Sequence, residues 1–209
     1  MAKTPSQDFL RTDNRLITLL FCDLRGFTAI SQKSEPEEVQ GMVNTFLGNM
    51  VSCIDALEGT VDKFIGDAVM ALFGAPMPSD DHALRALLCA VKMRDVHNAW
   101  QKQRADLGLP TLPMGIGLAT GTAVVGNIGT KTRVGYSALG ETVYVAGKLC
   151  DEAKAGEILT TVNTHRAAHA VAKQYPRRFA LPRFQFNKTG ILEGETLSAP
   201  VGIVSVTTA

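Results

Sequence analysis

Two strand-like runs stand on either side of a single Gly66-Asp67 break. Residues 60–65 and 68–73 have β-forming composition, and only these two residues are left to connect them. Strands joined so closely are expected to pair as an antiparallel hairpin. The strongest two-residue hairpin signal has the reverse order, Asp-Gly, but the short break still predicts a tight turn with Asp67 at its tip.

An earlier apolar run ends on a second aspartate. Leu16 to Cys22 is nearly continuous in apolar character, as in a buried strand, and Asp23 is its first charged residue. Hard cations such as Mg²⁺ take oxygen ligands and are usually held by one or two carboxylates together with waters and phosphates. Asp23 and Asp67 are therefore candidate metal ligands, the alternative being a strand terminator and a turn former.

Amphipathic spacing predicts the helices. Apolar residues recur every three or four positions across 35–57, where Ser34 is a candidate cap and Pro36 lies in the first turn. The same periodicity predicts helices over 80–104 and 141–153, and a strand followed by a helix over 157–172.

The remaining β-structure completes an α+β fold. Residues 114–119 and 122–128 are predicted to form a strand pair, and 179–186 and 200–206 late strands separated by a turn at Thr189-Gly190. Strands interleaved with helices around a central hairpin match a ferredoxin-like βαββαβ core with extra C-terminal strands and helices better than a parallel sheet.

Composition limits the classes of function. The chain has 209 residues, of which 45% are hydrophobic and 20% charged, which suits one domain. A net charge of +1 predicts no nucleic-acid partner and no anionic-membrane surface. The four cysteines are widely spaced, which predicts buried free thiols and a cytoplasmic location. No apolar run is long enough to span a membrane. We expect a flexible lead-in at 1–14 and the domain at 15–209.

Five motifs follow one another in an order that resembles the catalytic domain of class III nucleotidyl cyclases, the adenylate and guanylate cyclases. The resemblance extends from about Arg15 to Val206, and no single motif carries it. The motifs are Phe-x-Asp-x-x-Gly-Phe-Thr at 21–28, Lys-Phe-Ile-Gly-Asp at 63–67, Gly-Ile-Gly-Leu-Ala-Thr-Gly at 115–121, Gly-Asn-Ile-Gly at 126–129 and Gly-Glu-Thr-Val at 140–143.

The resemblance implies roles for individual residues. Asp23 and Asp67 would bind two Mg²⁺ or Mn²⁺ ions per site, with the backbone carbonyl of Leu24 as a further metal contact. Lys63 and Ser137 would read the purine. A lysine donates to an acceptor such as adenine N1, and a serine hydroxyl can accept from the 6-amino group, so this pair favours ATP over GTP. The alternatives are an exposed strand lysine and a turn serine.

Three positions depart from the family pattern. Tyr144 and Lys148 stand where active members have an asparagine and an arginine facing the ribose and phosphates. Lysine keeps the charge but not arginine's bidentate fork, and the tyrosine ring could instead pack at an interface. Glu193 stands where a lysine usually contacts the triphosphate, and its like charge should weaken phosphate binding.

The resemblance predicts an adenylate cyclase that works as a homodimer and converts ATP to 3′,5′-cyclic AMP and pyrophosphate. A regulatory domain or partner is expected to control it. The departures leave an alternative, a catalytically impaired domain that binds nucleotide and regulates a partner. A guanylate cyclase is the second alternative, although such enzymes typically carry glutamate at the position of Lys63.

Overall fold

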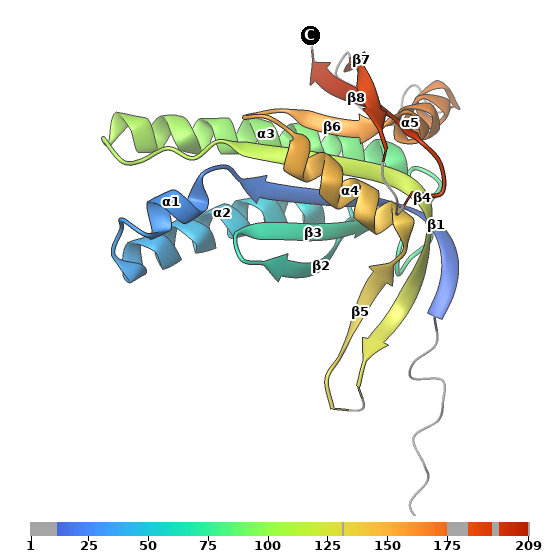
Figure 1. Cartoon of the computed structure of the whole chain (residues 1–209), viewed down its shortest axis with the longest axis horizontal. Coiled ribbons are helices and arrows are strands. Elements are labelled where there is room, and N and C mark those ends of the chain that lie inside the picture. The colour runs from blue at the N-terminus through green and yellow to red at the C-terminus, as the bar shows by residue number, and fades with distance from the viewer. Residues whose placement is uncertain (1–11, 131, 175–183, 194–196, 209) are drawn as a thin grey trace, which may run out of the picture.

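The computed structural model describes residues 12–130, 132–174, 184–193 and 197–208. Eight strands and five helices alternate along these segments (Figure 1). In chain order they are β1 (Thr12–Leu24), α1 (Phe27–Ser31), α2 (Pro36–Ala56), β2 (Thr60–Ile65), β3 (Ala68–Phe73), α3 (His82–Asp106), β4 (Met114–Gly129), β5 (Val134–Leu139), α4 (Glu141–Glu152), β6 (Ile158–Thr161), α5 (Val162–Gln174), β7 (Phe184–Leu192) and β8 (Val201–Thr208).

The strands form one sheet with the order β2-β3-β1-β4-β6-β8-β7, and β5 pairs separately with β4. β1 lies between β3 and β4 and pairs antiparallel with both. The first part of the chain therefore follows the predicted βαββαβ plan, with α2 and α3 as its helices, and the later strands extend the sheet. The predicted α+β class is confirmed.

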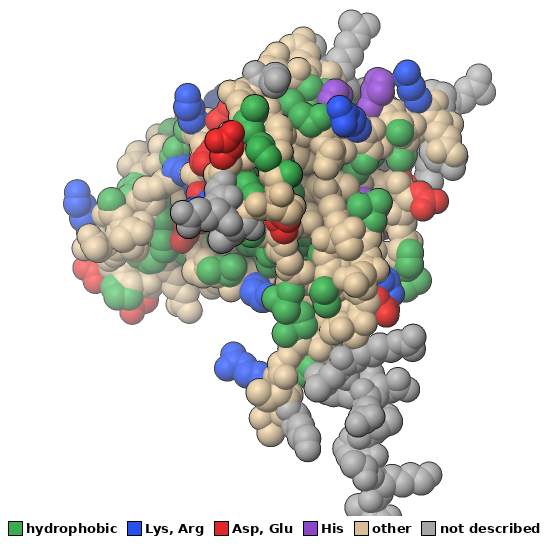
Figure 2. All heavy atoms as spheres, turned by 45° about the vertical axis from the view of Figure 1, so that its right-hand side comes forward, with side chains coloured by type: hydrophobic (Ala, Val, Ile, Leu, Met, Phe, Trp, Pro, Cys, Tyr) green, Lys and Arg blue, Asp and Glu red, His purple; other side chains and the backbone are tan. Residues whose placement is uncertain are grey.

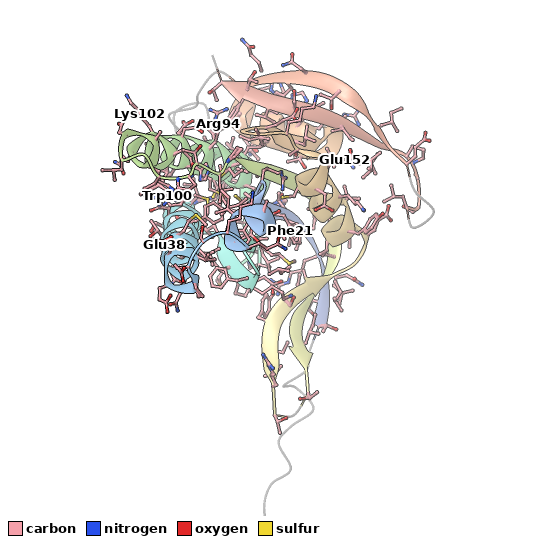
Figure 3. All side chains as sticks on the ribbon, turned by 60° about the vertical axis from the view of Figure 1, so that its left-hand side comes forward. Phe21, Glu38, Arg94, Trp100, Lys102 and Glu152 are labelled. Carbon is pink, nitrogen blue, oxygen red and sulfur yellow. The ribbon has the colours of Figure 1, made fainter. Side chains whose placement is uncertain are left out.

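Two apolar layers cover the two faces of the sheet. Buried side chains of α2, α3 and α5 pack on one face, and those of α4 pack on the other (Figure 1). Between α2 and α3, the His97 ring lies 5.5 Å from Phe46 and 5.7 Å from Trp100, measured between centroids. Trp100 lies between these two helices in Figure 3. The single helix on the opposite face leaves that face more open.

The predicted hairpin is present. β2 and β3 pair up to Ile65 and Ala68, so that Gly66 and Asp67 alone form the turn. Gly66 has a φ of 65°, a conformation that glycine adopts without steric cost. The β2–β3 pairing shifts register between Val61 and Lys63, which leaves one extra residue in β2.

The predicted strand pair at 114–128 is wrong, because 114–129 is a single long strand, β4. The small residues around Gly121 resemble a break, but they allow α4 to approach closely: a Cβ on Gly121 would lie 2.5 Å from Thr142 Oγ1. Thr142 Oγ1 also donates to the carbonyl of Thr122, 2.8 Å away. The second half of β4 instead pairs with β5, a strand that the sequence did not predict.

Three local predictions are also wrong. Helix α2 begins at Pro36 with Glu35 as N-cap and no side-chain cap, so Ser34 does not cap it. Thr189 and Gly190 lie inside β7, where a register shift follows residue 188, and form no turn between strands. β1 begins at Thr12, so residues 12–14 belong to the sheet and not to a lead-in. The rest of that lead-in, 1–11, and residues 179–183 of the expected late strand lie outside the described residues.

The prediction of buried free thiols from composition holds. All four cysteines are buried and free, which confirms the expected thiols. Among the described helices, none has the length and apolar character needed to cross a membrane.

Candidate functional site

Side chains along β1 alternate between the two faces of the sheet, and this alternation determines which face carries Asp23. Ile17 and Leu19 pack in the layer with α4, whereas Leu20 and Cys22 pack in the layer with α2 and α3. Side chains two residues apart on a strand share a face, so Asp23 lies on the α4 side. Its side chain is 30% exposed.

The structure brings Asp23 and Asp67 together. Cys22 pairs with Val69, so the next residues of β1 lie beside the tip of the β2–β3 hairpin. The two carboxyl groups are close enough for the charge of Asp67 to act on Asp23. Burial, and then the charge of Asp67, raise the pKa of Asp23 to about 6. Two acidic groups that repel each other in this way are suited to a shared cation.

Arg25 ties this pair to α4. Its Nη1 lies 3.0 Å from Asp23 Oδ2, its Nε donates to the Ala153 carbonyl at 3.1 Å, and its Nη2 donates to the Cys150 carbonyl. Arg25 thus joins the end of β1 to the C-terminal end of the helix. Gly115 leaves room for this contact, since a Cβ there would collide with the guanidinium.

The carboxylates of Asp23 and Asp67 are the candidate cation ligands at this site. Among the described residues, no group of three or more His, Cys, Asp or Glu side chains could hold a metal ion. The Asp23–Asp67 pair therefore fits a hard ion that takes its other oxygens from water and phosphates, as Mg²⁺ does. Leu24 ends β1 with a buried side chain.

Lys63 and Ser137 also come together, although 74 residues separate them in the chain. Lys63 Nζ donates to Ser137 Oγ at 2.8 Å, which joins β2 to β5. Ser137 is buried, whereas the Lys63 side chain is 49% exposed. The two candidate base-reading residues thus form one hydrogen-bonded unit, and Ser137 lies in a strand and not in a turn.

Tyr144 and Lys148 lie on the exposed side of α4, while Val145 and Leu149 face the sheet. The Lys148 Nζ lies 6.0 Å from the centre of the Tyr144 ring. The i, i+4 spacing therefore keeps both side chains on one face of the helix, as expected.

Glu193 lies apart from these groups. It follows the end of β7, the edge strand opposite β2, and is exposed. Ahead of β8, the Ser198 amide and hydroxyl donate to Glu141 Oε1 of α4 at 3.1 and 3.0 Å. Within one chain, the structure does not bring Glu193 to the aspartates.

Sequence reasoning missed two residues of this region. Arg25 follows the end of β1, two positions after Asp23, a spacing that could have indicated the ion pair. Asp62 contacts both Lys63 and Ser137, and nothing in the sequence pattern indicates this contact because it depends on the register shift in β2.

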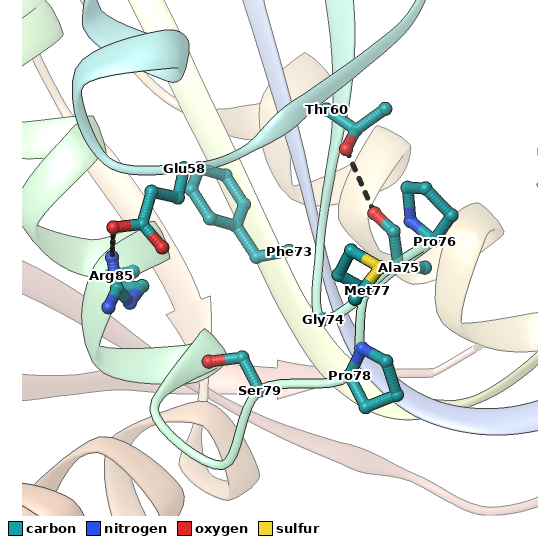
Figure 4. A pocket seen from close by; sticks show the side chains of 10 residues that line it. All are labelled: Glu58, Thr60, Phe73, Gly74, Ala75, Pro76, Met77, Pro78, Ser79 and Arg85. Atoms are coloured by element: carbon teal, nitrogen blue, oxygen red, sulfur yellow. Dashed lines mark hydrogen bonds and ion pairs between the residues drawn. The ribbon is translucent and has the colours of Figure 1, made fainter.

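A cavity of about 270 Å³ lies at the other end of the same hairpin (Figure 4). Phe73 and Gly74 line it, and Arg85 and Glu58 form an ion pair of 3.0 Å at its wall. Thr60 Oγ1 donates to the carbonyl of Ala75 at 2.9 Å. None of the candidate site residues lines this cavity, so we place the site at the aspartate pair and at the Lys63–Ser137 unit.

The chain is similar in sequence and fold to known nucleotidyl cyclases. The family model of the adenylate and guanylate cyclase catalytic domain matches residues 11–191. Adenylate cyclase 1 of Rhizobium meliloti is 38% identical over 133 residues, which cover 64% of this chain and 20% of that protein. Adenylate cyclase of Anabaena cylindrica is 37% identical over 139 residues, covering 65% and 27%. The matched region thus covers less than a third of the length of each of these two relatives.

Two solved structures share the fold over nearly the whole chain. The adenylyl cyclase CyaB from P. aeruginosa superposes with a TM-score of 0.84 at 30% identity, covering 96% of this chain and 97% of that one. The guanylyl cyclase Cya2 superposes with a TM-score of 0.81 at 36% identity, covering 93% and 92%. Together with the family match, these likenesses show that the chain belongs to the family of adenylate and guanylate cyclase catalytic domains.

Proposed function

We propose that this domain is an adenylate cyclase, which converts ATP to 3′,5′-cyclic AMP and pyrophosphate. The observation that carries the choice of ATP is the contact between Lys63 and Ser137, because it presents a donor beside a hydroxyl that can accept. Adenine offers the complementary pair, an acceptor at N1 and a donor at the 6-amino group. Relatives named adenylate cyclase at 37–38% identity support the same choice.

The reaction joins the ribose 3′-oxygen to the α-phosphorus and breaks the bond from that phosphorus to the oxygen of the β-phosphate. Asp23 and Asp67 would hold the ions, with the carbonyl of Leu24 as a candidate contact. Bound Mg²⁺ or Mn²⁺ would supply a lowered pKa for the 3′-hydroxyl and charge neutralisation on the phosphates. Arg25 holds Asp23 in place through its ion pair.

We further propose that two copies of the domain form the site, with the aspartates of one copy facing the base-reading residues of the other. Large apolar side chains are exposed beside those residues: Phe64 at 51%, Ile65 at 54%, Leu139 at 54% and Tyr144 at 39%. Figure 2 shows hydrophobic side chains gathered where the β4–β5 hairpin leaves the body of the molecule. A second copy would remove this apolar surface from water.

The substitutions on α4 support a slow enzyme. Lys148 can place positive charge near the triphosphate but cannot grip it with two parallel hydrogen bonds as arginine does. Tyr144 offers a hydroxyl on a much larger side chain than asparagine. Losing one preorganised donor costs about two to three orders of magnitude in rate. The same residues favour the second candidate, a catalytically impaired domain that binds nucleotide and regulates a partner. This candidate also depends on the cation pair.

The free cysteines support a reducing compartment, and we propose the cytoplasm.

The solved guanylyl cyclase Cya2, which is 36% identical to this chain, is the reason to test GTP beside ATP as a substrate.

Metal-free protein should lose stability as the pH rises from 5 to 8. The raised pKa of Asp23, about 6, means that its protonated form stabilises the fold below this value and that the stabilisation is lost once the group ionises beside Asp67. The neutral variant Asp23→Asn should lack this loss. Thermal unfolding is measured in a chelator at pH 5 and at pH 8. The unfolding temperature of Asp23→Asn, relative to that of the wild type, should be several degrees higher at pH 8 than at pH 5.

Mn²⁺ at pH 8 should raise the unfolding temperature of the wild type and leave that of Asp23→Asn nearly unchanged. Asp55→Asn, at an exposed position of α2, is the matched control and should behave as the wild type. Equal stabilisation of both variants by Mn²⁺ would contradict the assignment of Asp23 as a ligand.

Purified protein with Mn²⁺ and ATP should form cyclic AMP, and Asp23→Ala should lower the rate at least 100-fold because the cation pair loses a ligand. Cyclic nucleotide is measured by chromatography, with GTP in a parallel reaction and Asp55→Ala as control. Wild-type product no greater than that of Asp23→Ala would refute the enzyme. Calorimetry with a non-hydrolysable ATP analogue then tests the regulatory candidate, which requires metal-dependent binding.

Restoring the family pattern on α4 should speed the reaction. The double variant Tyr144→Asn, Lys148→Arg should raise kcat roughly 10- to 100-fold, since it returns a bidentate phosphate donor and a smaller polar side chain. Lys92→Arg, on the exposed side of α3, is the control for a general effect of arginine. A double variant no faster than the wild type would show that Tyr144 and Lys148 are already suited to this site.

A further inference from the structure

Asp62 is buried next to the base-reading residues. Val61 pairs with Ala71 and Lys63 with Met70, so Asp62 is the extra residue of a β-bulge. A bulge re-aims side chains that would otherwise alternate. The Asp62 side chain is only 1% exposed, although aspartate is almost never fully buried unless it is paired.

Three side chains form a small polar cluster. Ser137 Oγ is hydrogen-bonded to Asp62 Oδ2 at 2.7 Å and to Lys63 Nζ at 2.8 Å, and Lys63 Nζ forms an ion pair with Asp62 Oδ1 at 2.9 Å that lacks hydrogen-bond geometry. An ammonium group can only donate and a carboxylate can only accept. Ser137 must therefore donate its single proton to Asp62 and accept from Lys63.

This arrangement leaves a defined pattern for a ligand. The Ser137 hydroxyl has no proton left, so toward a base it can act only as an acceptor through its second lone pair. Lys63 donates one of its three N–H groups to Ser137, so it keeps donors for a ligand, and its side chain is 49% exposed. The unit thus presents an acceptor beside a donor.

We propose that Asp62 is a positioning residue that determines purine specificity by fixing the polarity of the Ser137 hydroxyl. This inference rests on the proposed cyclase function and deepens it. An acceptor at Ser137 complements the 6-amino group of adenine, and the remaining Lys63 donor complements N1. Guanine carries a 6-oxo acceptor and an N1–H donor, so the same unit sets acceptor against acceptor and donor against donor.

Replacing the carboxylate by an amide tests the idea. Asp62→Asn keeps the shape but can donate to Ser137, which frees the hydroxyl proton to point at a 6-oxo group. The ratio of kcat/KM for ATP to kcat/KM for GTP should fall about tenfold or more, as expected when a buried polar mismatch is relieved. Binding of non-hydrolysable ATP and GTP analogues, measured by calorimetry, should show the same fall without turnover.

Matched variants separate specificity from structure. Asp55→Asn, exposed on α2, should keep the wild-type ratio. Ser137→Ala should lower the ratio as well, and adding Asp62→Asn to it should change the ratio little further, because Asp62 acts through that hydroxyl. If Asp62→Asn fails to fold, the same measurements are made on Asp62→Ser, which removes the charge with a smaller side chain.

The outcomes are distinct. A wild type that prefers ATP, with a folded Asp62→Asn whose ratio stays within about twofold of it, overturns the specificity role and leaves the proposed cyclase intact. A wild type that neither turns over nor binds ATP overturns the proposed function and the specificity role together. A lowered ratio in both assays supports Asp62 as the residue that sets the preference.

Discussion

The antiparallel pairing of β1 with both β3 and β4 is the constraint on which the site depends. This register sets Cys22 opposite Val69 and Asp23 opposite Gly115. Asp23 thereby lies beside the hairpin tip that carries Asp67 and within reach of Arg25. A slip of one residue would turn every side chain of β1 to the other face and bury the carboxylate among the residues of α2 and α3. The pairing of β1 in the core and the proposed binding of a cation by Asp23 thus require the same register.

The register of the β2–β3 hairpin serves a second function. Without a bulge, Asp62 and Lys63 would point to opposite faces of β2. With it, both reach Ser137 of β5, which joins the edge of the sheet to the hairpin of β4 and β5. The extra residue of the bulge therefore creates a polar unit with one consistent set of hydrogen bonds, in which Lys63 donates to Ser137 and Ser137 donates to Asp62. We infer that specificity for the base depends on this unit, whereas cation binding depends on the pairing of β1.

Local patterns in the sequence predicted much of the fold. The apolar run ending at Asp23, the Gly66-Asp67 break and the helical periodicities all correspond to observed elements, because each is set by neighbours along the chain. The continuity of β4 through Gly121 and the presence of β5 could not be predicted in this way. They depend on the close approach of α4 and on pairing between distant strands. Motif order indicated Lys63 and Ser137, while the contact of Asp62 with both required the three-dimensional register.

In the proposed dimer, one copy supplies the aspartates of each site and the other copy supplies the base-reading residues. Mixing Asp23→Ala with Lys63→Ala tests it directly through the rate of cyclic AMP formation. Each variant alone should be nearly inactive. An equal mixture should recover about a quarter of the wild-type rate, because half of the dimers are mixed and one of their two sites is complete. A mixture as inactive as its components would contradict the claim that two copies share each site.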